Sequence, residues 1–145
     1  MVPVFRAAVL AYKVTLRPAA AREERAGKPE VMARFLLVAP RYVSRAGEYY
    51  EFPLGLAYLS SALRKAGHEV TCLNLNHFDE PLVTTLWRTL SGAPDDLILA
   101  TGGLSVHFDA VRRIFEAARS LRPGLVTVAG GGLVSTARDY ARFLQ

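Results

Sequence analysis

Four short apolar segments, each followed by a stretch with helical periodicity or a helix start, constrain the fold of this chain more than any other feature. The segments are Phe35–Ala39, His68–Leu75, Leu97–Ala100 and Leu125–Ala129. Short apolar runs of this kind are typical of strands in a parallel sheet, both faces of which are covered by helices. The alternation predicts an α/β fold, a Rossmann-like doubly wound parallel sheet, with the fourth strand buried on both faces.

Three stretches between these segments have the spacing of helices that bury one face. Pro53 begins the first helix and Gly67 ends it. The second has Asp79 as its expected cap and Pro81 at its first position, and Ser105 is the expected cap of the third. The expected inner faces are Leu56, Leu59, Leu63 and Ala66, then Leu82, Leu86 and Leu90, and finally Val111, Ile114, Phe115, Ala118 and Leu121.

The length of 145 residues suits one domain with a hydrophobic core. Residues 1–31 are rich in alanine and arginine and have no sustained apolar period, so we expect a loosely ordered extension there and the folded domain at residues 32–145. Ser135 is a candidate cap for a last helix, but no fifth strand follows it. We therefore expect a doubly wound sheet that is truncated before its fifth strand, and a domain that is incomplete at its C-terminus.

The net charge of +5 does not indicate a nucleic-acid partner. Residues 34–145 carry twelve Lys or Arg against ten acidic residues, which leaves +2 on the predicted domain. The group Arg112, Arg113, Arg119 and Arg122 falls on one predicted helix, where we expect a solvated face. The chain has no aromatic interleaving of the kind that stacks bases.

The single cysteine, Cys72, excludes an intramolecular disulfide and is consistent with a reducing, cytoplasmic compartment. Because it falls in an apolar strand, we expect a buried structural thiol. No run of 18 apolar residues exists, so the sequence predicts no transmembrane helix and no membrane partner.

Candidate ligand-binding residues follow the ends of the predicted strands, because ligands of doubly wound sheets bind outside the carboxyl ends of the strands. The sequence places Pro40 and its loop, Asn74–His77, Thr101–Ser105 and Gly130–Gly132 at that edge. Three consecutive glycines allow a turn with positive φ and a ligand in direct contact with backbone N–H groups. A tight turn that binds nothing gives the same pattern, and this alternative stays open.

Several functions lack their motifs at this edge. The first strand-to-helix loop has no Gly-x-Gly-x-x-Gly, no Gly-Lys-Ser or Gly-Lys-Thr exists for a P-loop, and Gly-x-Ser-x-Gly is absent. His68 is expected to be structural, at the opposite end of the sheet, and His77 to lie at the surface. His107 falls close to the ligand edge, but a sole histidine without acidic partners does not make a metal site.

Residues 34–145 contain three motifs that together resemble a known family. The motifs are Pro53-Leu-Gly-Leu-Ala-Tyr-Leu-Ser-Ser-Ala-Leu-Arg-Lys-Ala-Gly-His-Glu-Val70, Leu73-Asn-Leu-Asn76 and Gly130-Gly-Gly132. The chain is similar in these motifs to the N-terminal cobalamin-binding domain of cobalamin-dependent radical S-adenosylmethionine enzymes. The first motif is the most specific of the three, and the glycine turn is the least specific.

The resemblance implies a cobalamin-binding module of such an enzyme, for example a methyltransferase, with its radical catalytic domain downstream or in trans. Its implied site residues are the Pro40 loop facing the corrin, Thr101, Gly102, Gly103 and Ser105 beside the third strand, and Gly130, Gly131 and Gly132 admitting the nucleotide tail beside the fourth. Small residues give room for the cofactor, and hydroxyl and N–H groups can bond its amides and phosphate.

Two departures from the family patterns limit what the resemblance implies. Asp-x-His-x-x-Gly, which supplies a histidine to cobalt in the methionine-synthase type, is absent, so His77 is not predicted as a cobalt ligand. Cys72 alone cannot replace the three cysteines that hold a four-iron cluster, so the chain is not expected to contain an iron–sulfur cluster or to be catalytic by itself.

Two alternative functions remain. The chain could be the N-terminal Rossmann-like half of an enzyme that uses a nucleotide or nucleotide-sugar, with the glycine turn on phosphate. It could also be a remnant that folds poorly and binds nothing, because a sheet without its fifth strand has an open edge.

Overall fold

The computed structural model describes residues 32–134, which form an alternating series of strands and helices. The elements are β1 (Arg34–Ala39), α1 (Leu54–Lys65), β2 (Glu69–Asn74), α2 (Leu82–Leu90), β3 (Leu97–Gly102), α3 (Phe108–Leu121) and β4 (Val126–Gly130), with short 3₁₀ turns at Leu75–His77, Ser105–His107 and Gly132–Val134. The predictions for residues 1–31 and for a helix capped by Ser135 lie outside the described residues.

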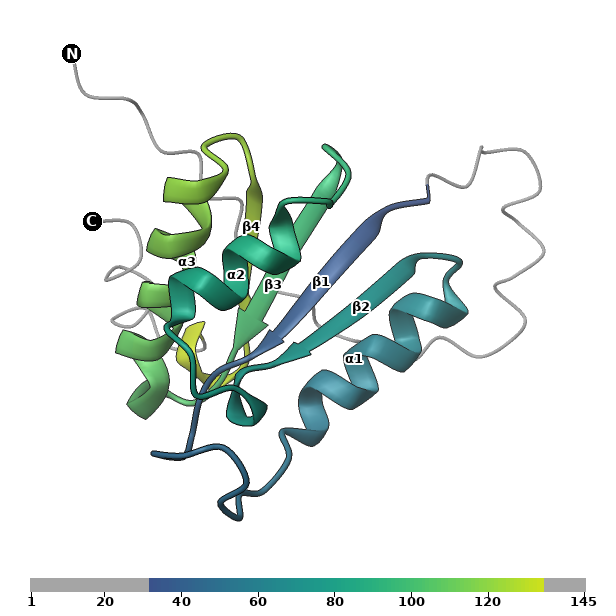
Figure 1. Cartoon of the computed structure of the whole chain (residues 1–145). Helices are drawn as coiled ribbons and strands as arrows, with labels where there is room; N and C mark the ends of the chain where they lie inside the picture. The colour runs from purple at the N-terminus through teal and green to yellow at the C-terminus, as the bar shows by residue number, and fades with distance from the viewer. Residues whose placement is uncertain (1–31, 135–145) are drawn as a thin grey trace, which may run out of the picture.

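All pairings in the sheet are parallel, and the strand order is β2-β1-β3-β4. Helix α1 lies on one face of the sheet, and α2 and α3 lie on the other (Figure 1). The prediction of an α/β, doubly wound, Rossmann-like fold is therefore confirmed. From β1, the chain passes through α1 to β2 on one side of β1, and it then returns through α2 to β3 on the other side. The strand order therefore reverses between β1 and β3, which is the topological switch point of the sheet.

The main core lies between the sheet and helices α2 and α3. Its buried residues include Leu36 and Val38 of β1 and Leu99 of β3. The predicted inner faces of the two helices are confirmed, because Leu86, Leu90, Val111, Ile114, Phe115 and Ala118 are buried and Leu82 and Leu121 pack against them. Burying these side chains supplies most of the hydrophobic stabilisation of the described domain.

The opposite face of the sheet is thinly covered, which corrects two predictions. No residue of α1 is buried, Leu59 is 39% exposed, and Ala66 is exposed. Val126 is 52% exposed, so the prediction that the fourth strand is buried on both faces is wrong. The reason is positional: α1 packs against β1 and β2, and β4 is an edge strand of the described sheet.

Three further predictions about individual residues are also wrong. Cys72 is exposed, because β2 is an edge strand, and its Sγ lies 3.7 Å from Ser60 Oγ. Asp79 does not cap α2, which has no side-chain cap and follows Pro81. Ser105 does not cap α3 directly, because the 3₁₀ turn Ser105–His107 comes between them.

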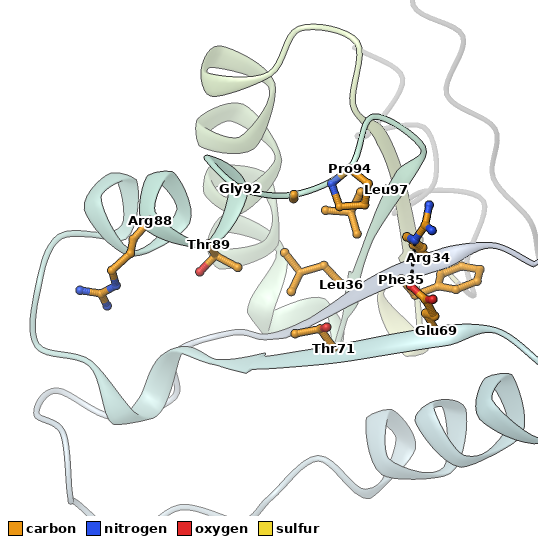
Figure 2. Close-up of a pocket in the computed structure, with 11 residues that line it drawn as sticks. Arg34, Phe35, Leu36, Glu69, Thr71, Arg88, Thr89, Gly92, Pro94 and Leu97 are labelled. Atoms are coloured by element: carbon orange, nitrogen blue, oxygen red, sulfur yellow. Dashed lines mark hydrogen bonds and ion pairs between the residues drawn. The ribbon is translucent and has the colours of Figure 1, made fainter.

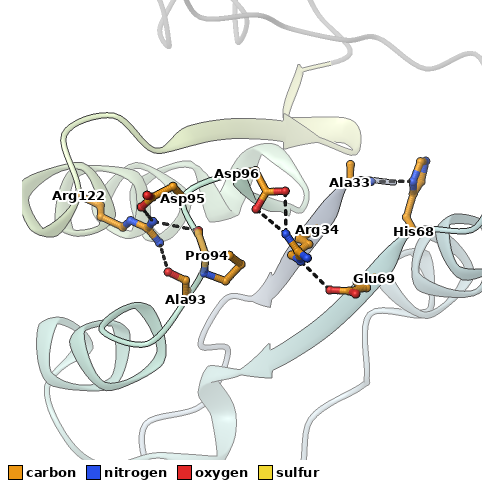
Figure 3. Close-up of polar contacts among 9 residues, drawn as sticks. All are labelled: Ala33, Arg34, His68, Glu69, Ala93, Pro94, Asp95, Asp96 and Arg122. Atoms are coloured by element: carbon orange, nitrogen blue, oxygen red, sulfur yellow. Dashed lines mark hydrogen bonds and ion pairs between the residues drawn. The ribbon is translucent and has the colours of Figure 1, made fainter. Parts of the chain in front are cut away.

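Charged side chains tie the amino ends of the strands together (Figure 3). Arg34 bonds both carboxylate oxygens of Asp96 at 2.9 Å and Glu69 at 2.8 Å. Arg122 reaches Asp95 at 2.8 Å and two backbone carbonyls in the turn before β3. His68 Nδ1 accepts the Ala33 N–H at 3.3 Å, which confirms its structural role at this end.

The predicted arginine face of α3 is only partly solvated. Arg112 is exposed and pairs along the helix with Asp109 and Glu116. Arg119 instead bonds Thr127 of β4, and Arg122 belongs to the amino-end contacts. Within residues 32–134, no helix is long and apolar enough to span a membrane.

Candidate functional site

The loops that follow β1, β3 and β4 leave the same edge of the sheet. The register aligns Val38 with Thr101 and Gly102 with Gly130, so the carboxyl ends of these strands are level. The switch point between β1 and β3 opens at this edge, and ligands of open α/β sheets bind there. The predicted site residues are therefore brought to one edge, although they differ in how they are exposed.

Pro40 is fully buried and acts as an anchor for the loop after β1. Its carbonyl accepts a hydrogen bond from Asn76 Nδ2 at 2.9 Å, and Asn76 Oδ1 accepts the Tyr42 N–H at 2.6 Å. Asn76 is only 1% exposed, so these two hydrogen bonds are shielded from water. Sequence reasoning placed Asn76 at the edge without assigning it this role. Its signal in the sequence is an amide directly after Leu75, a buried leucine just beyond the end of β2.

Thr101 and Ser105, the two predicted hydroxyl residues, have different surroundings. Thr101 is 3% exposed, and its Oγ1 donates to the Val38 carbonyl at 2.7 Å. That hydroxyl therefore fixes β3 to β1 at the switch point. Ser105 is exposed and begins the 3₁₀ turn before α3, where it faces the solvent side of the edge.

Two of the predicted glycines are required because the turns after β3 and β4 pack backbone against backbone. A Cβ on Gly102 would overlap the carbonyl oxygen of Gly130. Gly131 has a φ of +80°, and a Cβ there would lie 2.8 Å from the Gly103 carbonyl oxygen. The Leu133 N–H donates to that same oxygen at 2.8 Å. The turn geometry alone thus explains glycine at positions 102 and 131.

Gly130 differs from Gly102 and Gly131. A Cβ at Gly130 would meet no atom of the described residues within 4 Å, and the φ of this residue is not positive. Neither the turn nor the packing requires glycine there. A glycine without such a requirement, placed at the ligand edge, leaves space against the backbone that a side chain would fill.

Four aromatic side chains form a row along the edge from β2 to β3, and we call Tyr42, Tyr50, His77 and His107 the aromatic row. Tyr50 OH lies 3.2 Å from His77 Nε2 and accepts a hydrogen bond from Asn74. The ring centroids of Tyr42 and His107 are 4.7 Å apart, and those of Tyr42 and Tyr50 are 6.4 Å apart. Burial raises the pKa of the Tyr42 phenol, so Tyr42 is neutral at physiological pH.

Asp79 fixes the loop between β1 and α1. Its carboxylate accepts the Ala46 N–H at 2.8 Å and pairs with Arg41 at 2.7 Å. These bonds, the Ala46 N–H first, hold the pKa of Asp79 below its usual value. Within residues 32–134, no group of three or more His, Cys, Asp or Glu side chains could hold a metal ion.

Exposed apolar side chains surround the edge and form what we call the apolar rim. They come from the end of the β1–α1 loop, the start of α1 and the β3–α3 turn, and they are Tyr49, Phe52, Leu54, Leu104 and Val106. Tyr49 is 91% exposed and Val106 is 83% exposed. Exposed apolar groups gathered at one end of a domain mark a surface that binds another molecule.

A cavity of about 440 Å³ lies at the other end of the sheet, beside β2 and the end of α2. Leu36, Thr71, Thr89 and Leu97 line it, and Arg34 and Glu69 stand at its margin (Figure 2). None of the predicted site residues lines this cavity. It belongs to the amino ends of the strands, so it is separate from the candidate site at the switch point.

Comparison with known proteins gives one finding about the family. The family model for the B12 binding domain matches residues 41–144, from the loop after β1 to beyond the glycine turn after β4. No curated protein matches the chain.

Proposed function

Because this chain belongs to the family of B12 binding domains, we propose that residues 32–145 form a module that holds cobalamin at the carboxyl edge of the sheet. The match over residues 41–144 carries the proposal, since it includes the loops after β2, β3 and β4 and all of the loop after β1 except Pro40. The reversal of strand order between β1 and β3 gives independent support, because open α/β sheets bind their ligands there.

The residues at the edge fit a large cofactor with an apolar ring and a polar tail. Gly130 leaves space against the backbone, and the N–H groups of the glycine turn and the Ser105 hydroxyl are candidate partners for the amides and phosphate of the tail. The apolar rim would lie against the face and the methyl groups of the corrin. Three predicted residues would act indirectly, by holding the strand ends in place, because their own atoms are used in packing and internal hydrogen bonds. They are Pro40, Thr101 and Gly102.

When bound, cobalamin supplies a cobalt ion that can carry a methyl group. The residues of this chain would bind and orient the cofactor and keep water from one of its faces. We further propose that the parent is a cobalamin-dependent radical S-adenosylmethionine enzyme, such as a methyltransferase, with its catalytic domain downstream or in trans. The motif from Pro53 to Val70 supports this, and the cysteines of a cluster would have to come from that other domain.

Titration of the whole chain with hydroxocobalamin, followed by gel filtration with detection of the corrin absorbance, tests the proposal. We expect the corrin to co-elute with the protein at a ratio near one to one. Gly130→Val should weaken binding by about tenfold or more, because the new side chain fills the space left for the ligand. Gly124→Val is the matched control, since Gly124 also has no neighbour within 4 Å of its Cβ position but lies in the turn before β4.

Free corrin beside a folded protein would contradict the proposal. Retention of a nucleotide or nucleotide-sugar by the same protein would then favour the alternative function at the glycine turn. Equal weakening by Gly130→Val and Gly124→Val would show that the space at Gly130 is not the contact surface.

A further inference from the structure

Tyr42 and His107 meet across the switch point, although they belong to loops that follow different strands. Tyr42 lies in the loop after β1, and His107 ends the 3₁₀ turn after β3. Their ring centroids are 4.7 Å apart and the ring planes are inclined by 58°, which is an attractive aromatic arrangement. This contact bridges the loops after β1 and β3 at the switch point, where open α/β sheets bind their ligands.

The backbone of Tyr42 is held in place from the β2 side. Its N–H donates to Oδ1 of the buried Asn76 amide, whose Nδ2 donates to the Pro40 carbonyl and to Asn74 Oδ1. Only the Tyr42 side chain can therefore move without breaking this buried pair. Rotation of the ring about its side-chain bonds would open the contact and leave the loop in its place.

The ring of His107 is held by the turn in which it lies. Its Nδ1 accepts the Leu104 N–H at 3.2 Å, so the ring proton of the neutral imidazole is on Nε2. The ring also lies directly over Gly103, where a Cβ would come within 2.7 Å of Nδ1. Glycine at position 103 is thus needed for the ring to pack at this position.

We propose that Tyr42 and His107 form a clasp that closes the switch-point crevice in the cofactor-free chain and separates when the nucleotide tail of cobalamin enters. The inference rests on the proposed function, and it adds a conformational step to it. Tyr42 is the moving part and His107 the fixed part, because the histidine ring accepts a hydrogen bond from the Leu104 N–H and lies against Gly103. The clasp shields the crevice from water until the cofactor arrives.

Stopped-flow mixing with hydroxocobalamin tests the clasp through the association rate. Tyr42→Ala should raise this rate by about 2- to 10-fold, which is the population change expected when one aromatic pair is lost. Gly103→Ala should raise it as well, because the added methyl group displaces the His107 ring from below. Tyr42→Phe keeps the ring and should behave as the wild type. Trp87→Ala, which removes an exposed ring from α2, is the control for loss of an aromatic side chain.

Proton NMR of the His107 ring gives a second readout that does not depend on the association rate. In the cofactor-free chain the Tyr42 ring current should displace the His107 ring signals, and Tyr42→Ala should abolish that displacement. Addition of cobalamin to the wild type should abolish it too.

Three outcomes overturn the inference in different ways. Unchanged association rates in Tyr42→Ala and Gly103→Ala, with normal binding by the wild type, would refute the clasp and leave the proposed function standing. Loss of affinity through faster dissociation alone would show that Tyr42 is a direct contact of the bound cofactor. Absence of corrin binding by a folded wild type would overturn the proposed function and the clasp together.

Discussion

At the amino ends of the strands, exposed ion pairs of Arg34 and Arg122 join neighbouring elements. At the carboxyl ends, the turns after β3 and β4 instead pack backbone against backbone, and the buried Asn76 amide holds the loop after β1. Arg34 joins β1 to β2 and to the turn before β3 through exposed carboxylates. At the other end the turns after β3 and β4 pack through Gly102, Gly103 and Gly131, with almost no side chain between them.

This difference explains why the carboxyl edge suits a ligand better than the amino edge does. Ion pairs at the amino edge satisfy their own charges, and surface pairs of this kind contribute little stability each. Backbone packing at the carboxyl edge occupies little volume, and the side chains of the apolar rim are exposed there. A large cofactor can therefore approach the carboxyl edge without displacing any ion pair of the amino end.

The largest effect is expected from Gly102→Ala, which breaks the packing of the two turns. The added methyl group would overlap the Gly130 carbonyl oxygen, so β3 and β4 would have to separate at their carboxyl ends. We expect a loss of about 2 to 3 kcal/mol in the free energy of unfolding, measured by urea denaturation. Gly130→Ala is the matched control and should change stability by no more than about 1 kcal/mol in either direction. Similar losses in both variants would contradict the backbone-packing explanation.

Asn76→Leu tests the buried amide that holds the loop after β1 at the carboxyl edge. The substitution leaves the Pro40 carbonyl and the Tyr42 N–H without their partner. An unsatisfied buried polar group costs about 1 to 3 kcal/mol, so we expect a loss of about 2 kcal/mol in the free energy of unfolding. Thr71→Val, at an exposed position of β2, should stay within about 0.5 kcal/mol of the wild type. An equal effect of the two substitutions would show that the loop after β1 is not held by Asn76.

The elements of the fold could be predicted from the sequence because they depend on local pattern. Apolar runs ending at Ala39 and Ala100 are recovered as strands, and the inner faces of α2 and α3 are buried as their spacing indicates. The predictions for Cys72 and Val126 were wrong because burial depends on which strand lies at an edge. Strand order depends on how helices that are far apart in the sequence pack on the sheet, so a local sequence pattern does not predict which strands lie at the edges.

The candidate site shows the same limit at the level of single residues. The glycines could be identified from the sequence, but the reason for each could not. Gly102 and Gly131 are needed because the two turns pack against each other there, whereas neither the turn geometry nor the packing requires glycine at position 130. The clasp between Tyr42 and His107 joins residues from separate loops, so only the folded structure brings them together. Asp79 has the position of a helix cap, yet the Ala46 N–H and Arg41 bind its carboxylate instead.

A smaller effect is expected from Arg34→Met at the amino ends. The substitution removes the cation and leaves the carboxylates of Glu69 and Asp96 without it. We expect a lower midpoint of thermal unfolding at low salt and a smaller difference at high salt, because salt screens exposed charges. Arg113→Met, at an exposed position of α3, is the matched control. Corrin binding should be unchanged in both variants, and a loss of binding in Arg34→Met alone would show that the two ends are coupled.

The smallest effect is expected from the ion pair that fixes the loop after β1, and it depends on pH. Folding lowers the pKa of Asp79 below its ordinary value of 3.8. The carboxylate therefore contributes its full stabilisation of the loop at any pH above 3.8, and this contribution is lost as the pH falls through the pKa of the folded state. Hydrogen exchange of the Ala46 N–H measures it directly, since that group donates to Asp79. Exchange in Asp79→Asn should be severalfold faster than in the wild type near neutral pH, and the ratio should approach one in strong acid. A ratio that does not change with pH would show that the loop is held by its other contacts, including the bonds of Arg41 to the Val43 and Ser44 carbonyls.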